Sequence, residues 1–363
     1  MKIAFITIQV GFNFGSVLQT IATAHLLQKH GMTPICVNYI PPRTTYKRYW
    51  IEGCSGVKKL IRRVLFFPFY YKANNNFYGY LAKYCPLSHK IYAEDNFVKA
   101  CPTADLYITG SDQVWNCNHN EGIDKHYFFY GIKGRKIAFS SSIGMKTLPK
   151  DYFYYMQRAL SEYDEISVRE DSAVEILSSM GLNATQLLDP TLLLNKEEWK
   201  PYASKRLVKE KYRFVYLPYN TKDENLVYNS VRKIARRNNL IIVTYSRDFF
   251  KCKNADKTIT FANPGDILSL ILYADYVVTN SFHGTAFSIN LNKQFWVYMP
   301  SEFSTRLESL LKLCKLEHRH IEDLITDEQI FEIIDYSESN KILDHERIKG
   351  GNFLNNIVKN VSK

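Results

Sequence analysis

The chain has 363 residues, a formal net charge of +11 and a hydrophobic fraction of 46%. This length favours about two domains, and the lack of any apolar run near the ~20 residues of a membrane-spanning helix argues for a soluble globular protein. The positive charge fits an anionic small substrate, a lipid headgroup surface or nucleic acid, and it does not select among them.

Cysteine usage and the N-terminal stretch both bear on the compartment. The seven cysteines are scattered and include no CxxC pair, which argues against a disulfide framework and a zinc site, so we expect a reducing compartment and no metal. Lys2, a short apolar stretch and Ala22–Ala24 imitate a signal peptide. Because Gln9, Asn13 and Gln19 interrupt that stretch, we expect a cytoplasmic protein.

The first half of the chain alternates between strand and helix patterns. Residues 2–8 form a β-rich run, residues 9–16 a Gly/Asn loop, and residues 17–31 show helical apolar spacing that ends at a glycine. Later β-rich segments cover residues 33–39, 104–112, 135–144 and 165–170, and a helix is expected at 171–181. Such continuous apolar strands are typical of a parallel sheet that is covered on both faces.

The alternation restarts after a charged stretch at 191–211, which Pro201 interrupts. Strands are expected at 213–219, 240–246, 275–280 and 294–299, and helices at 223–238, 263–274, from Thr285 and at 304–316. The pattern predicts an α/β protein with two Rossmann-like domains that face a cleft, with the site at the carboxyl ends of the strands. The expected boundaries are a first domain at 1–190, a linker at 191–211, a second domain at 212–345, and a C-terminal helix or tail at 346–363.

The segment 43–84 does not follow this alternation. It mixes basic residues with leucine, valine and phenylalanine in the run GVKKLIRRVLFFPFYYK. A basic and aromatic amphipathic insert of this kind can lie on an anionic membrane, which would place the protein at the inner face of the plasma membrane. The alternative is a helix that packs on its own domain with its basic face in water.

Polar residues gather at the ends of the first strands. Asn13, Gly15 and Ser16 precede a helix, where backbone N–H groups and the positive helix end favour an anion, although an ordinary turn has the same pattern. The segment 109–116 combines polar groups with one flat aromatic ring, which suits a sugar. Its candidate residues are Ser111, Asp112, Gln113, Trp115 and Asn116.

Three further residues follow the remaining strands of this half. Arg169 suits a phosphate, or else forms a salt bridge with Glu170 or Asp171. Asp112 is a candidate to orient or deprotonate an acceptor, or else a helix cap. Asp189 precedes a proline and can simply shape the turn.

His283 stands between the apolar run 276–278 and a helix expected from Thr285. An imidazole can donate or accept a proton near neutral pH, although a lone histidine is more often structural. Ser281, Gly284 and Thr285 surround it at the helix start and are candidates for binding an anionic donor. Arg306 can supply a second cation, or else belongs to a solvated helix face.

These motifs together resemble the polysaccharide pyruvyl transferase family over roughly residues 3–320, apart from the insert. The matching segments are GFNFGSVLQT, TGSDQVWN, ISVREDSAVEIL, LDPTLLL and TNSFHGTAFSINLNKQF. The resemblance implies a GT-B-like fold and transfer of pyruvate from phosphoenolpyruvate to a sugar as a ketal. It also implies acceptors of polysaccharide biosynthesis that are often linked to a lipid such as a polyprenyl carrier, and no cofactor. His283 matches the proposed general acid of the family, and Arg169 matches an arginine suited to the donor.

One departure keeps other functions open. Many family members have Arg-Leu before the His-Gly pair, where this chain has Ser281 and Phe282. A GT-B glycosyltransferase that uses a nucleotide-sugar donor is therefore the alternative enzyme. A basic glycan- or nucleic-acid-binding protein is the alternative without catalysis, but the chain has no RNA-binding or helix-turn-helix signature.

Overall fold

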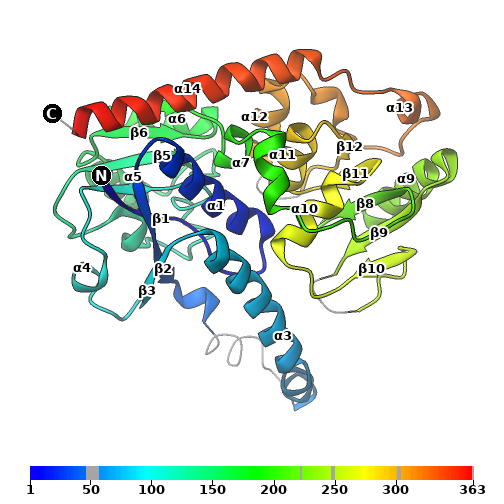
Figure 1. The fold of residues 1–363 in the computed structure, drawn as a ribbon, viewed down its shortest axis with the longest axis horizontal. Helices are drawn as coiled ribbons and strands as arrows, with labels where there is room; N and C mark the ends of the chain where they lie inside the picture. The colour runs from blue at the N-terminus through cyan, green and yellow to red at the C-terminus, as the bar shows by residue number, and fades with distance from the viewer. Residues whose placement is uncertain (46–56, 221–222, 247–249, 301–303, 362–363) are drawn as a thin grey trace. The chain divides into compact units, whose positions relative to one another are not determined.

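The computed structural model describes residues 1–45, 57–220, 223–246, 250–300 and 304–361. The chain divides into two compact units. Unit 1 consists of residues 1–190 and 349–363, and unit 2 consists of residues 191–348. Each unit contains one parallel β-sheet with connecting helices (Figure 1), so the chain has two Rossmann-like domains.

Unit 1 has a seven-stranded sheet in the order β3-β2-β1-β4-β5-β6-β7, and all neighbouring strands are parallel. Its strands are β1 (Lys2–Ile6), β2 (Thr33–Ile40), β3 (Leu87–Tyr92), β4 (Leu106–Thr109), β5 (Lys136–Ser141), β6 (Glu165–Val168) and β7 (Thr185–Gln186). Its helices are α1 (Phe14–Lys29), α3 (Val57–Tyr84), α4 (Phe97–Ala100), α5 (Lys150–Leu160) and α6 (Asp171–Ser179), with short 3-10 helices at Pro42–Thr44 and Lys125–Phe128. Strands β1, β4 and β5 are almost entirely buried, as the continuous apolar runs predict.

Unit 2 repeats this design with a five-stranded parallel sheet in the order β10-β9-β8-β11-β12. Its strands are β8 (Tyr212–Tyr216), β9 (Ile241–Tyr245), β10 (Lys257–Ile259), β11 (Tyr276–Thr279) and β12 (Gln294–Val297). Its longer helices are α9 (Glu224–Asn238), α10 (Pro264–Leu272), α11 (Phe282–Asn290) and α12 (Thr305–Leu313), with shorter ones at α13 (Asp327–Phe331) and the 3-10 turn Glu317–Arg319. Asn263, Pro264 and Asp266 start α10 with a capping box, as their order in the sequence indicates.

The stretch 191–211, which we expected to be a linker, contains ordered structure that belongs to unit 2. It contains most of α7 (Pro190–Leu193), the helix α8 (Lys196–Trp199) and a 3-10 turn at Lys200–Tyr202. Trp199 is buried, and its ring lies 5.0 Å from that of Phe287 on α11. The side chain of Asn290 also donates to two carbonyl groups of this stretch. Burial of an indole explains why a segment with linker-like composition is fixed in place.

The C-terminal helix α14 runs from Ser337 to Val361, so it begins nine residues before the expected tail. Its last part belongs to unit 1, where Phe353 stacks on Phe139 of β5 at 6.1 Å. Arg135 donates a hydrogen bond to the carbonyl of Asn360 at 2.8 Å. These contacts tie the end of the chain to the sheet that its beginning forms.

Of the predicted insert 43–84, residues 46–56 lie outside the described residues. Residues 57–84 form α3, a helix of 28 residues that contains Pro68 and packs against α1. Three residues of its second half, Ala73, Phe77 and Leu81, are buried at a spacing of four. The second half of α3 therefore agrees with the alternative prediction, a helix that packs on its own domain.

Candidate functional site

The histidine site of unit 2 lies where the strand order of the sheet reverses. The chain passes from β8 to β9 and β10 on one side, and then returns to place β11 on the other side of β8. Open parallel sheets bind ligands at the carboxyl ends of their strands beside such a reversal. The Asn280 side chain, directly after β11, donates to the carbonyl of Tyr219 at 2.6 Å, so the loops after β8 and β11 are joined at this point.

Helix α11 begins immediately after this junction and carries His283 in its first turn. Ser281 is the N-cap, and its hydroxyl accepts from the amide of Gly284 at 3.3 Å. The Thr285 hydroxyl donates to the carbonyl of Ser281 at 3.0 Å. The helix thus starts three residues before the predicted Thr285. Its N-terminal end carries the positive end of the helix dipole, and His283 is 3% exposed.

Arg306 brings the predicted second cation to the histidine site. Its guanidinium carbon lies 5.5 Å from the centroid of the Phe282 ring, and that ring lies edge-on to the imidazole of His283 at 5.1 Å. Arg306 is 4% exposed, so the solvated-face reading of this residue is wrong. A buried guanidinium over an aromatic ring is stabilised by the ring quadrupole. Phe282 occupies the position where many members of the resembled family have leucine. Its ring therefore binds the guanidinium of Arg306, which comes from α12.

Gly284 allows α11 to start this close to the sheet. A Cβ atom at this position would overlap the hydroxyl of Thr279 and lie 3.1 Å from its Cβ. Thr279 cannot easily move, because its hydroxyl donates to the carbonyl of Tyr216 at 2.7 Å and accepts from the amide of Ser281 at 3.1 Å. The glycine after the histidine is thus required by packing between a helix and a strand end.

We expect Gly284→Ala to lower the free energy of unfolding of unit 2 by about 1–3 kcal/mol, the usual cost of overpacking. Urea titration, with hydrogen exchange followed in β11, measures this loss. Gly79→Ala is the matched control, because a Cβ at this helical position of α3 meets nothing within 4 Å. That variant should gain about 0.5–1 kcal/mol from reduced backbone entropy. Equal stability of Gly284→Ala and the unchanged protein would contradict the packing argument.

The sheet of unit 1 also reverses its strand order, between β1 and β4. The loop after β1 ends at Asn13, whose side chain accepts from the amides of Gly15 at 3.0 Å and Ser16 at 3.4 Å. Asn13 is therefore the N-cap of α1, and it already uses amides that we expected to bind an anion. The Ser16 hydroxyl donates to the carboxylate of Asp112, which follows β4 with a positive φ of 73°.

Arg169 lies in a buried cluster of carboxylates at the same edge of the sheet. Its guanidinium nitrogens lie 2.5 Å from Asp189, 3.4 Å from Asp112 and 3.8 Å from Glu170. The Arg169 side chain is 1% exposed. Burial alone would lower the pKa of the guanidinium, but the three carboxylates together raise it above its usual value.

This environment favours the salt-bridge alternative for Arg169 over the predicted phosphate-binding role. Three carboxylates already lie within 3.8 Å of the guanidinium, so its positive charge is used inside the cluster. The salt-bridge alternative is closer to the structure, although the shortest contact is with Asp189 and not with Glu170 or Asp171. Arg169 joins the loops after β4, β6 and β7.

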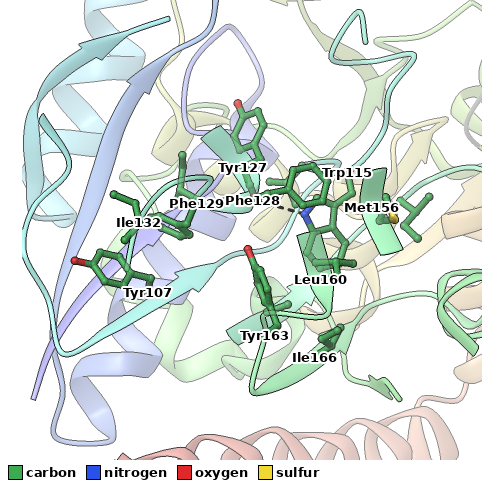
Figure 2. Packing of buried hydrophobic residues seen from close by; sticks show 14 of the residues in the cluster. Tyr107, Trp115, Tyr127, Phe128, Phe129, Ile132, Met156, Leu160, Tyr163 and Ile166 are labelled. Carbon is green, nitrogen blue, oxygen red and sulfur yellow. Dashed lines mark hydrogen bonds between the residues drawn. The ribbon is translucent and has the colours of Figure 1, made fainter. Parts of the chain in front are cut away.

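The loop 110–116 turns inward, which corrects the expected sugar platform. Trp115 is fully buried, its ring stacks on Phe128 at 5.9 Å, and its indole N–H donates to the carbonyl of Tyr127 (Figure 2). The polar residues of the loop bond to one another and to neighbouring loops. The Asn116 side chain donates to that of Gln113 at 2.6 Å, and the Ser111 hydroxyl donates to Asp189 at 2.8 Å.

Sequence reasoning gave no functional role to two residues that organise these edges. The sequence alone predicts that Asp189 shapes a turn, and the signal of its larger role is its position after the last strand of a parallel sheet. Asn280 lies directly after β11, beside the candidate histidine, and the same positional argument finds it.

Cysteines and metal-ligating side chains add no further centre in the described residues. Six cysteines there are free thiols, and Cys54 lies outside the described residues. No group of three or more His, Cys, Asp or Glu side chains in the described ranges is arranged to hold a metal ion.

Comparison with known proteins gives one family match and several structural matches. Residues 13–302 match the family model described as polysaccharide pyruvyl transferase. No protein with a curated description is similar to this chain in a sequence comparison.

Two solved structures illustrate the fold. A Staphylococcus aureus MnaA–UDP structure has a TM-score of 0.50 and 11% sequence identity, covering 96% of this chain and 90% of that chain. An Arabidopsis thaliana UGT89C1 structure has a TM-score of 0.50 and 9% identity, covering 99% of each chain. At this level of identity the likeness concerns the fold alone, which is GT-B-like.

Proposed function

Because this chain belongs to the polysaccharide pyruvyl transferase family, we propose that it transfers the pyruvyl group of phosphoenolpyruvate to a saccharide as a ketal. The observation that carries the proposal is the family match over residues 13–302, which spans strands β2 to β12 and the turn with His283. We further propose a lipid-linked saccharide of polysaccharide biosynthesis as the acceptor.

The donor is an enol phosphate with up to three negative charges, so its site needs cations and aligned N–H dipoles. The histidine site of unit 2 supports such a role, because Arg306 and His283 both contact the ring of Phe282 and His283 lies in the first turn of α11. The amides of Ser281, Gly284 and Thr285 already donate to Thr279 and Ser281, so the donor role proposed for these residues rests on the positive end of α11 that their turn forms. Arg169 takes no part in donor binding in this proposal, because its carboxylate partners occupy it.

His283 acts as the general acid of the reaction. In its protonated form, it gives a proton to the methylene carbon of phosphoenolpyruvate, which becomes a methyl group. The oxocarbenium at the neighbouring carbon is attacked by one sugar hydroxyl, inorganic phosphate leaves, and a second hydroxyl closes the ketal. The two hydroxyl protons balance the proton taken up by the methyl group and the one on the released hydrogen phosphate.

Asp112 has a positioning role in this scheme. Its carboxylate accepts from Ser16 and Arg169, and also from the amide of Gln113 at 2.9 Å, so the loop after β4 is held against α1. A carboxylate that accepts these bonds is well placed to fix the loop and is less suited to removing a proton from a sugar.

Incubation with phosphoenolpyruvate and a saccharide acceptor tests the proposal. We expect release of inorganic phosphate together with a product heavier by one pyruvyl ketal, and no reaction when UDP-N-acetylglucosamine replaces the donor. Consumption of the UDP-sugar without any use of phosphoenolpyruvate would contradict the proposal and would favour a glycosyltransferase.

A further inference from the structure

The first half of α3 exposes an apolar surface that unit 1 does not cover. Figure 1 shows this part of the helix extending away from the sheet of its unit. The second half packs against the loop after β1 through the ring of Phe12. This ring lies 5.9 Å from the buried ring of Phe77 and 4.9 Å from the ring of Tyr70. The second half of α3 therefore packs on unit 1, and the first half is left exposed.

Five large apolar residues define what we call the outer face of α3. Their successive positions differ by one, three, one and four residues, which places them on one side of a helix. Their exposed fractions are 47% for Leu60, 54% for Ile61, 56% for Val64, 64% for Leu65 and 44% for Phe69. A solvated helix carries polar residues on its outer side, so an exposed apolar cluster of this kind indicates an interaction surface.

The charge of α3 narrows the choice of partner. The helix contains six basic residues and no aspartate or glutamate. The basic residues are Lys58, Lys59, Arg62, Arg63, Lys72 and Lys83. An all-basic amphipathic helix complements an anionic lipid surface, whose headgroups attract Lys and Arg while the acyl boundary takes up Leu, Val and Phe. A second copy of the chain would instead bring two sets of cations together, which repel each other.

The helix does not fit a membrane-spanning role. None of the helices in the described part of the chain has the length and apolar character that crossing a bilayer requires. The basic residues lie close to the outer face in sequence, and Pro68 interrupts the apolar run. These features are those of a helix that lies in the headgroup region.

We propose that the outer face of α3 docks the protein on an anionic lipid bilayer. The docking requires neither donor nor acceptor, so it stands or falls independently of the proposed reaction. The same surface would bring the enzyme to acceptors that are carried on a lipid.

Co-sedimentation of the full chain with vesicles tests this proposal. We expect binding to vesicles of phosphatidylcholine and phosphatidylglycerol, and much weaker binding to phosphatidylcholine alone or at high salt. Leu65→Ser should weaken binding about tenfold, because serine cannot supply the free energy that a leucine side chain gains when it moves from water into the lipid. Val64→Ser is a second variant at an exposed position with an effect in the same direction.

Ile348→Ser is the matched control, because Ile348 is a helical residue on α14 with the same exposed fraction of 64%. It should bind vesicles like the unchanged protein. Equal binding by Leu65→Ser and Ile348→Ser would overturn the proposal, as would equal binding to neutral and anionic vesicles. A dimer in the absence of lipid that Leu65→Ser dissociates would also overturn it, in favour of a second copy as the partner.

Discussion

Replacing His283 by glutamine is expected to lower the turnover number by about 10²–10⁴, the usual contribution of a general acid. Glutamine fills a similar volume in the first turn of α11, but it cannot deliver a proton to a carbon atom. Because Arg306 and the helix end remain in place, the KM for phosphoenolpyruvate should change much less than the turnover number. Steady-state release of phosphate measures both quantities.

His318→Gln is the matched control for this substitution. His318 lies in the same unit, on the 3-10 turn Glu317–Arg319, and its side chain is 45% exposed. Its removal should leave turnover unchanged. If His283→Gln turned over phosphoenolpyruvate at the rate of His318→Gln, His283 would have no part in the chemistry.

Replacing Arg169 by methionine is expected to lower the free energy of unfolding of unit 1 by about 3–5 kcal/mol, because removing one partner of a buried ion pair leaves uncompensated charge. Here three carboxylates would be left together, and two of them, Asp189 and Glu170, have side chains that are at most 1% exposed. Urea titration combined with hydrogen exchange in strands β4 to β6 locates the loss. An insoluble or partly unfolded variant would be the extreme form of the same result.

Arg135→Met is the control for the loss of an arginine. Arg135 pairs with Asp164 at 2.8 Å and also donates to the carbonyl of Asn360, but both ion-pair side chains are about 40% exposed, so losing Arg135 should cost only about 1–2 kcal/mol. If Arg169→Met were as stable as Arg135→Met, the cluster would not hold unit 1 together. The phosphate role of Arg169 would then deserve a new test.

The fold was largely predictable because parallel strands leave a strong local signal. The buried strands β1, β4, β11 and β12 are continuous apolar runs, and each was expected from the sequence. The edge strands β3 and β10 were not expected. Their residues are mostly half-buried or exposed, so they lack the apolar run that marks a central strand.

The histidine site was predictable because its residues are close in the sequence. Ser281, His283 and Gly284 belong to one turn between a strand and a helix, where local rules on caps and helix ends apply. The contact of Arg306 with Phe282 depends on how α12 packs. The sequence therefore predicted Arg306 as a second cation of the site, but not that its guanidinium lies over the ring of Phe282.

The carboxylate cluster and the buried loop of unit 1 were not predictable in the same way. Asp112, Arg169 and Asp189 come from three separate loops, and their pairing follows from the strand order of the sheet. Trp115 is flanked by polar residues, which is typical of a sugar platform. The ring of Trp115 instead stacks on Phe128, and its N–H bonds to Tyr127, in a segment twelve or more residues further along the chain. Contacts between separate segments of this kind decide whether an aromatic ring faces a ligand or the core.

Running the reaction in deuterium oxide tests the central claim most directly. If His283 delivers a solvent-derived proton to the methylene carbon of phosphoenolpyruvate, mass spectrometry should find one deuterium in the methyl group of each ketal formed. A ketal product without deuterium in that methyl group, or no pyruvyl product from any saccharide acceptor, would contradict the account.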